Sequence, residues 1–286
     1  MKRLVHAILL CLLAITWLES KLEHTFWQDE AMQELLEKAE GIEPNDDRET
    51  LFAQLVNEQA QAQNGSMRST SLHDRITQKT LQQEFTNLAL DKKFYSYLWN
   101  AQDGSILAMS AVGLDGQPYF ANSFLLGFVP FKTTNAWQPL ALLSMRKTYM
   151  FDHDQYGALY VDVWQNSKQA YAHSHGDCED HALLLTDWLI GLGFDARVVV
   201  GETSAGEGHA WVILFTDSGD YVLEATSKRA PKSINDFLRV ERAIHYYPQI
   251  QFNRESLWEN TGSVLTTNYK DSKWKLRSRF ARDVSG

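Results

Sequence analysis

The clearest pattern of hydrophobic and polar positions lies between residues 176 and 226. From Cys178 onward, apolar residues recur at the spacing of an amphipathic helix, and the run ends at two glycines, which are typical of a helix C-terminus. Three β-rich runs follow, over residues 196–200, 209–215 and 221–225, with a glycine-rich loop between the first two and a short polar turn between the last two. The sequence therefore predicts an α+β fold in which a helix beginning at Cys178 packs against an antiparallel sheet.

The pattern is less regular in the remainder of the chain. Residues 73–99 carry an amphipathic pattern that predicts one broken helix, residues 105–131 are β-rich, and residues 135–150 have helical character. Residues 19–60 are acidic and contain two helical patterns, and a Gln-, Asn- and Ser-rich stretch typical of a linker follows them. We therefore expect an N-terminal helical extension ahead of the main domain.

Cys178, His209 and Glu224 occupy positions in these elements that suit nucleophilic catalysis. A helix N-terminus stabilises a thiolate through unpaired N–H groups and the positive end of the helix dipole, and the thiolate is the nucleophilic form of cysteine. If the two strands after the glycine-rich loop are antiparallel neighbours, His209 and Glu224 lie near the same end of the sheet. The imidazole can then take the thiol proton and later protonate a leaving group, while the carboxylate orients the imidazole. This pattern predicts a Cys–His–Glu triad.

Three short motifs resemble the transglutaminase-like superfamily. They are GDCEDHA at residues 176–182, GHAW at residues 208–211 and YVLEAT at residues 221–226. The resemblance covers residues 157–227 and implies a transglutaminase/papain-like core, in which a Cys-bearing helix packs on an antiparallel sheet. It also implies Cys178 as nucleophile, His209 as base and Glu224 at the acid position, where the family usually has Asp.

The motif GDCED is similar to the bacterial transglutaminase-like cysteine proteinases that cleave surface adhesins, whereas HAW and EAT are closer to the general transglutaminase core. The resemblance thus implies a thiol-dependent amide hydrolase, a cysteine peptidase that acts on a protein or peptide substrate. Two alternatives stay open. One is a protein-glutamine transglutaminase that forms isopeptide bonds, and the other is a non-catalytic or zinc-binding module with the same fold.

Asp177 and Glu179 flank the expected nucleophile. In the adhesin-cleaving relatives the matching acids bind calcium, so the resemblance implies a calcium site here, although the triad itself requires no cofactor. The alternative is that the two acids cap the N-terminus of the helix, which needs no metal.

Zinc is a further alternative, because nitrogen, oxygen and sulfur donors gather in the sequence around Cys178. The donors are His173, His175, Asp180 and His181. Such a site would leave the GHAW and YVLEAT motifs without a role, and the two histidines before the helix would have to fold back onto it.

Two expectations concern the surroundings of the thiol. The backbone N–H of Cys178 is the expected oxyanion donor, and Trp164 and Gln165 are candidates for the second donor by their position in the sequence. Trp211 lies two residues after His209, so on a regular strand both side chains lie on the same face.

The N-terminus carries a targeting pattern. Lys2 and Arg3 precede an apolar run up to Leu18, which predicts a signal anchor or a cleaved signal peptide. The positive charges before the run favour an orientation with the rest of the chain outside the cytoplasm. We therefore expect a bacterial, extracytoplasmic protein, periplasmic or at the cell surface, anchored to the inner membrane. Cys11 falls in the run, so Cys178 would be the only thiol in the exported part.

Composition limits the partners. The chain has 286 residues, of which 44% are hydrophobic, so it can build a sizeable core. A net charge of −9 argues against nucleic acid as the main partner. The C-terminal stretch is instead rich in basic residues interleaved with aromatic ones, which suits a solvated tail or contact with an anionic surface. We predict four segments: a signal segment (1–18), an acidic helical segment with a linker (19–71), a transglutaminase-like catalytic domain (72–262) and a basic tail (263–286).

Overall fold

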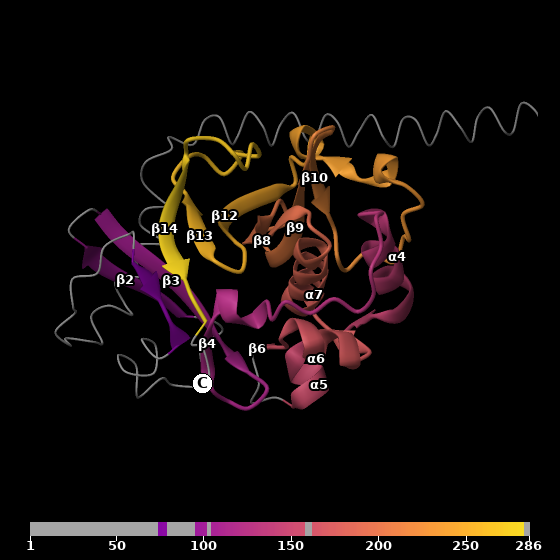
Figure 1. The fold of residues 1–286 in the computed structure, drawn as a ribbon, viewed down its shortest axis with the longest axis horizontal. Helices are drawn as coiled ribbons and strands as arrows, with labels where there is room; N and C mark the ends of the chain where they lie inside the picture. The colour runs from indigo at the N-terminus through magenta and orange to yellow at the C-terminus, as the bar shows by residue number, and fades with distance from the viewer. Residues whose placement is uncertain (1–73, 79–94, 102–103, 158–161, 283–286) are drawn as a thin grey trace, which may run out of the picture. The chain divides into compact units, whose positions relative to one another are not determined.

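The computed structural model describes residues 74–78, 95–101, 104–157 and 162–282 (Figure 1). All of these residues belong to the larger of two compact units, Phe52–Gly286. The predicted signal segment, the acidic helical segment and the linker lie outside the described residues. The following paragraphs concern the larger unit alone.

Helix α7 (Cys178–Gly191) forms the centre of this unit and begins at the predicted residue. Its apolar positions from Ala182 to Leu189 are buried, and Trp188 is fully enclosed. The helix ends where Gly193 takes a φ of 93°, a conformation that glycine adopts without steric cost. Because nearly every side of α7 is covered, its orientation is set by packing rather than by one amphipathic face.

The main sheet has eight strands, and α7 packs against its middle. Strand β8 (Asp195–Thr203) pairs with β9 (Gly208–Thr216), which pairs with β10 (Gly219–Leu223), all antiparallel. The full order is β1-β14-β13-β12-β8-β9-β10-β11. The remaining members are β1 (Arg75–Ile76), β11 (Leu238–Arg239), β12 (Tyr246–Phe252), β13 (Ser256–Asn260) and β14 (Trp274–Phe280). The predicted α+β class and the three predicted strands after α7 are confirmed.

Two smaller sheets and several short helices complete the unit (Figure 1). The four-stranded sheet contains β2 (Tyr95–Ala101), β3 (Gly104–Gly113), β4 (Pro118–Phe120) and β6 (Val163–Trp164). The two-stranded sheet joins β5 (Thr148–Tyr149) to β7 (His175–Gly176) in parallel. The helices are α4 (Trp137–Arg146), α5 (Asp152–Tyr156), α6 (Ser167–Ala172) and the 3₁₀ turns η1 (Ala121–Phe124), η2 (Ile234–Asp236) and η3 (Val240–Arg242).

The main sheet carries a hydrophobic cluster on each face. Val198, Val212 and Leu214 belong to the cluster that surrounds α7. Trp211 and Ile213, at alternate positions of β9, belong to a second cluster on the opposite face. Alternation along β9 therefore allows one strand to support the Cys-bearing helix on one side and to present His209 and Trp211 on the other.

Asp187 fixes the C-terminal half of α7. Its fully buried carboxylate accepts hydrogen bonds from the backbone N–H groups of Gly127 and Phe128, from the hydroxyl of Ser167 and from Arg254. A buried carboxylate with this many donors ties the helix to the loop before α4, to α6 and to the turn between β12 and β13.

Two predictions about secondary structure are wrong. Residues 274–280 form strand β14 inside the main sheet, not a basic tail, because Trp274, Ser278 and Phe280 point inward while basic residues occupy exposed positions between them. Residues 95–99 were predicted to end a helix, and they lie in strand β2. By contrast, the β-rich character of residues 105–131 is confirmed at its start, and the helical character of residues 135–150 is confirmed by α4.

Candidate active site

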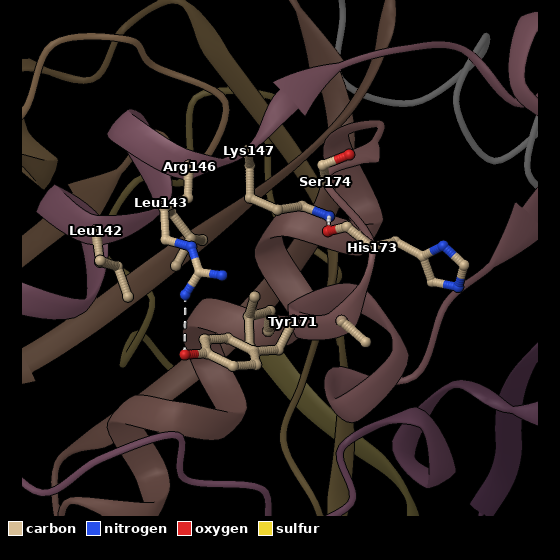
Figure 2. A pocket seen from close by; sticks show the side chains of 9 residues that line it. Leu142, Leu143, Arg146, Lys147, Tyr171, His173 and Ser174 are labelled. Atoms are coloured by element: carbon tan, nitrogen blue, oxygen red, sulfur yellow. Dashed lines mark hydrogen bonds between the residues drawn. The ribbon is translucent and has the colours of Figure 1, made fainter.

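Cys178 is the first residue of α7, and the backbone that leads to it is held by a buried lysine. The ammonium of Lys147 donates to the carbonyl oxygens of Ala170, His173 and His175 at 2.8, 2.9 and 3.0 Å. Figure 2 shows this side chain extending from the end of α4 to the backbone of His173. Burial is the main reason that the pKa of Lys147 is lowered to about 8. The three bonds fix the end of α6 and strand β7, two residues before the thiol.

His209 and Glu224 form a close pair. The His209 Nε2 atom lies 2.8 Å from Glu224 Oε2. The second carboxylate oxygen accepts the backbone N–H of Thr226 at 3.1 Å and the Thr226 hydroxyl at 2.7 Å. Because Nε2 is engaged by Glu224, Nδ1 is the ring nitrogen available to Cys178.

Electrostatics favours an imidazolium at this position. Burial by itself would lower the pKa of His209, but hydrogen bonds to Cys178 and Glu224 and their negative charges outweigh burial and raise it to about 10. For Glu224, burial acts to raise the pKa, and the interactions with His209 and Thr226 outweigh it and hold the pKa below its usual value. The two shifts are the signature of a carboxylate–imidazolium pair that can stabilise a neighbouring thiolate.

Strand register explains why these residues meet. Val212 of β9 lies opposite Leu223 of β10, so continuing the ladder brings His209 and Glu224 to diagonal positions on one face. Trp211 follows on the same face, with its ring 6.1 Å from the imidazole and nearly parallel to it. The predicted placement of Trp211 beside His209 is therefore confirmed.

A cluster of carboxylates lies on the other side of Cys178. It consists of Asp152, Asp162, Asp177, Glu179 and Asp180, whose oxygen atoms form two overlapping groups in which all ligand atoms lie within 4.8 Å of one another. We call it the carboxylate cluster. Its link to the thiol is direct, because Cys178 Sγ lies 3.3 Å from Glu179 Oε2.

Like charges in a buried place make this cluster unfavourable on its own. Burial first, and then the charge of Asp177, raise the pKa of Asp152 to about 7. The pKa values of Glu179 and Asp180 lie well above their usual range for the same two reasons. Partial compensation comes from backbone N–H groups, since Asp152 accepts from Val163 and Asp180 accepts from Gln165 at 2.7 Å.

The donor set of the carboxylate cluster fits a hard cation. Asp152 Oδ1, Glu179 Oε1 and Asp180 Oδ2 are buried oxygen atoms without a hydrogen-bond donor among the described residues. Several carboxylate oxygens around one point are the ligands that calcium prefers. The predicted pair Asp177 and Glu179 belongs to this cluster, and the sequence pattern did not bring Asp152, Asp162 and Asp180 together with that pair.

Helix capping does not account for the two predicted acids. Asp177 occupies the N-cap position of α7, but its side chain makes no capping hydrogen bond, and Glu179 is buried within the cluster. The alternative that Asp177 caps the helix is therefore wrong, because its carboxylate belongs to the carboxylate cluster and makes no hydrogen bond to the N–H groups of the first turn.

The zinc alternative finds no support in the described part of the chain. Its groups of side chains that could hold a metal are made of carboxylates alone. His173 is exposed, and Nδ1 of His175 lies 2.9 Å from the Ser174 hydroxyl. His181 is buried one turn after Cys178, and burial is the main cause that lowers its pKa to about 3, so it is neutral. These donors do not converge with Cys178 on one point.

The two candidates for the second oxyanion donor are engaged elsewhere. Trp164 donates its indole N–H to Asp162 at 2.7 Å. The Gln165 side-chain amide donates to the Tyr156 hydroxyl and to the carbonyl of His175, at 3.0 and 3.1 Å. Proximity in sequence was a poor guide here, because the side chains of Trp164, in β6, and of Gln165, just after it, are both buried in the protein.

Comparison with known proteins gives a partial match to one family. The sequence family described as the CEP76 peptidase-like domain matches residues 162–279, which contain all three triad residues. Curated relatives include the Centrosomal protein of 76 kDa from Homo sapiens, 55% identical over 38 residues, which are 13% of this chain and 6% of that protein. The protein of the same name from Danio rerio is 39% identical over 57 residues, which are 20% of this chain and 9% of that protein. The chain thus spans less than a tenth of the length of these two relatives.

Similar solved structures are more distant. Calcium-bound LapG from Legionella pneumophila is 18% identical, with 54% of this chain and 81% of that chain covered and a TM-score of 0.36. A candidate cysteine protease from Cytophaga hutchinsonii is 15% identical, with coverage of 36% and 34% and a TM-score of 0.27. Likenesses at these scores do not by themselves establish a common fold.

The predicted location is wrong. We expected a bacterial, extracytoplasmic protein anchored to an inner membrane, but the matching curated relatives named above come from vertebrates and are named after the centrosome. In the part of the chain that the structure describes, no helix is long and apolar enough to cross a membrane. The apolar N-terminal run that led to the prediction lies outside those residues.

Proposed function

We propose that this protein is a cysteine peptidase, a thiol-dependent hydrolase of amide bonds in a protein or peptide. The observation that carries the proposal is the hydrogen-bonded pair of His209 and Glu224, 2.8 Å apart, beside a cysteine at the first position of a buried helix. The match to a family described as peptidase-like supports the same chemistry.

In the proposed reaction, His209 takes the proton of Cys178 and the thiolate attacks the carbonyl carbon of the substrate. The tetrahedral oxyanion accepts a hydrogen bond from the backbone N–H of Cys178. When the C–N bond breaks, the imidazolium protonates the departing amine and a thioester remains on Cys178. Water then loses a proton to His209 and attacks the thioester, which releases the carboxylic acid and restores the thiol. Glu224 stabilises the imidazolium in both halves of the reaction.

Calcium is the cation that we propose for the carboxylate cluster. The members of the cluster, Asp152, Asp162, Asp177, Glu179 and Asp180, would supply the ligand oxygens, and the ion would supply positive charge that offsets the repulsion among them. In this arrangement the cluster keeps the first turn of α7 in place, and the reacting groups are those of the triad.

The proposal is tested first through the thiol itself. In the full chain, the second-order rate of alkylation by iodoacetamide is measured at Cys178 by peptide mass spectrometry, with N-acetylcysteine as the reference for an ordinary thiol. We expect Cys178 to react readily at about pH 6.5, where few ordinary thiols are ionised, and His209→Ala to abolish this advantage. Equal rates in the two proteins would overturn the proposal.

The reaction type is tested next. The protein is incubated with a proteome-derived peptide mixture, and new peptide termini are identified, with Cys178→Ala as the control. A parallel reaction contains a fluorescent primary amine. New termini that depend on Cys178 support the peptidase, whereas amine incorporated into glutamine without new termini would replace it with a transglutaminase.

A further inference from the structure

Glu224 has a partner that no motif predicts. Tyr246, the first residue of β12, donates its hydroxyl to Glu224 Oε2 at 3.0 Å. The same oxygen receives His209 Nε2, and the opposite oxygen receives two bonds from Thr226. The carboxylate is therefore held by four hydrogen bonds, which come from β9, from β12 and from the turn after β10.

Tyr246 reaches Glu224 from the far side of two strands. In the main sheet β12 is separated from β10 by β8 and β9. Gly201 of β8 lies opposite His209, and a side chain there would be blocked, because a Cβ atom would lie 2.2 Å from the carbonyl of Tyr247 and 2.9 Å from the Trp211 ring. Without a side chain at Gly201, the phenol ring can lie beside Trp211, with ring centroids 5.0 Å apart.

The direction of the bond is determined by the environment. Burial first, and then the charge of Glu224, raise the pKa of Tyr246 far above its usual value. The phenol therefore remains protonated at any physiological pH and donates to the carboxylate. Its ring lies beside the imidazole, with centroids 6.4 Å apart, and its hydroxyl is directed to Glu224.

A glutamate at the acid position needs such a partner. Glutamate has one more rotatable bond than aspartate, so a carboxylate held only by the imidazole could turn away from it, with a loss of orientation. Thr226 holds Oε1 and Tyr246 holds Oε2. With both oxygens held, Oε2 stays in position to accept the hydrogen bond from His209. Charge-assisted bonds of this kind are about twice as strong as neutral ones.

We propose that Tyr246 is a positioning residue of the triad, which holds Glu224 Oε2 in the place from which it orients and charges the imidazole of His209. This inference rests on the proposed function, since it assigns Tyr246 a role in that same site. It predicts that Tyr246 acts only through Glu224.

The test is a double-mutant cycle in the full chain, with the iodoacetamide alkylation rate of Cys178 at neutral pH as the readout. Tyr246→Phe removes the hydroxyl and keeps the ring. We expect the rate to fall about five- to tenfold, less than the full value of one hydrogen bond to a charged group, because this bond acts on the thiol only through Glu224 and His209. In a Glu224→Gln background the same change should have almost no further effect, because its target is already gone.

Tyr247→Phe is the matched control. Tyr247 is the next residue of β12, is similarly half-buried, and its hydroxyl makes no hydrogen bond within the described ranges. We expect a rate within about twofold of the unchanged protein. A fall in Tyr246→Phe that persists in full in the Glu224→Gln background would indicate a merely structural role and would overturn the proposal, as would an unchanged rate.

A second variant covers the case in which Tyr246→Phe loses its cooperative thermal transition. Glu224→Asp keeps the charge but is too short to meet His209 and Tyr246 together. A rate as high as that of the unchanged protein would show that the Tyr246 bond is dispensable, and a fall of about the same size as above supports the role. If the proposed function itself were wrong, His209→Ala would also leave the alkylation rate unchanged. If only the role of Tyr246 were wrong, His209→Ala would still lower that rate.

Discussion

The two sides of Cys178 follow opposite electrostatic rules. On one side, His209 and Glu224 carry opposite charges that raise the first pKa to about 10 and lower the second. On the other side, Glu179 and its neighbours carry like charges in a buried place, and their pKa values are raised. The thiol touches both sides, since it interacts with His209 and lies 3.3 Å from Glu179 Oε2.

The difference shows that one part of this site has its charges paired within the protein, whereas the other part depends on protons or a bound cation. The triad side is complete within the protein, because each charge has a partner of the opposite sign. The carboxylate cluster is incomplete, because backbone N–H groups and the charge of Lys147 compensate only part of its negative charge, and protons or a cation must compensate the rest. Both sides are joined at the first turn of α7, so a change in the cluster can reach the thiol through Glu179.

The largest expected effect is a loss of peptide cleavage without a loss of stabilisation by calcium. Cys178→Ser should abolish peptide cleavage, and His209→Ala should reduce its rate about 10²- to 10⁴-fold, since general acid–base catalysis is lost. Both variants should keep the full calcium-induced rise in melting temperature. His245→Ala, an exposed histidine beside Ser204, is the control and should cleave normally. Loss of the calcium response in Cys178→Ser would contradict the separation of the two sides.

Calcium should stabilise the protein through the carboxylate cluster. At a concentration 100 times the dissociation constant, a bound ion contributes about 2.7 kcal/mol, which corresponds to a rise of about 5–10 °C in melting temperature. Scanning calorimetry with calcium, with magnesium and with EGTA measures this rise. Asp152→Asn should remove it, whereas Asp154→Asn, two residues away and exposed, should not. Equal responses of the two variants would show that the cluster is not the site.

The carboxylate cluster and the triad should affect the free energy of unfolding over different pH ranges. In EGTA, carboxyl groups whose pKa is raised in the folded state bind protons more strongly than in the unfolded state, so stability falls as pH rises from about 4 through the folded value of about 7 for Asp152. The contribution of His209 is fully present below its unfolded pKa of about 6.5 and is lost as pH rises through about 10. Urea unfolding across pH 4 to 10 measures both.

Each window has its own control. Asp152→Asn should flatten the dependence between about pH 4 and 7 and leave the alkaline part, while His209→Ala should do the reverse. A single variant that flattened both windows would indicate that the two sides titrate as one group.

The smallest expected effect on cleavage comes from the hydrogen bond between Thr226 and Glu224 Oε1. Thr226→Val removes the 2.7 Å hydroxyl bond but keeps the backbone N–H bond to Glu224, so cleavage should slow only about two- to fivefold. Ser227→Ala, the neighbouring hydroxyl, which bonds only the backbone of Arg229 in the described structure, is the control. A loss as large as that of His209→Ala would mean that Thr226 contributes more than one hydrogen bond.

Local patterns account for the elements that were predicted correctly. Helix α7 and the strands β8 to β10 follow one another in sequence, and each has the period of its secondary structure, so neighbouring residues specify them. Strand β14 was missed because Lys275, Arg277 and Arg279 alternate with inward-pointing residues, and a charge count conceals that alternation. Its place between β1 and β13 is a property of the whole sheet.

By itself, the sequence determined the Cys-bearing helix, the two hairpins that follow it and the candidate triad, because these residues lie close together in the chain and in strand register. Only the tertiary structure decided the rest of the site. Tyr246 meets Glu224 across two strands, and Asp152 and Asp162 join the acids of α7 from separate segments. These contacts depend on how distant segments pack, and the burial that packing creates is what shifts the pKa values on both sides of the thiol.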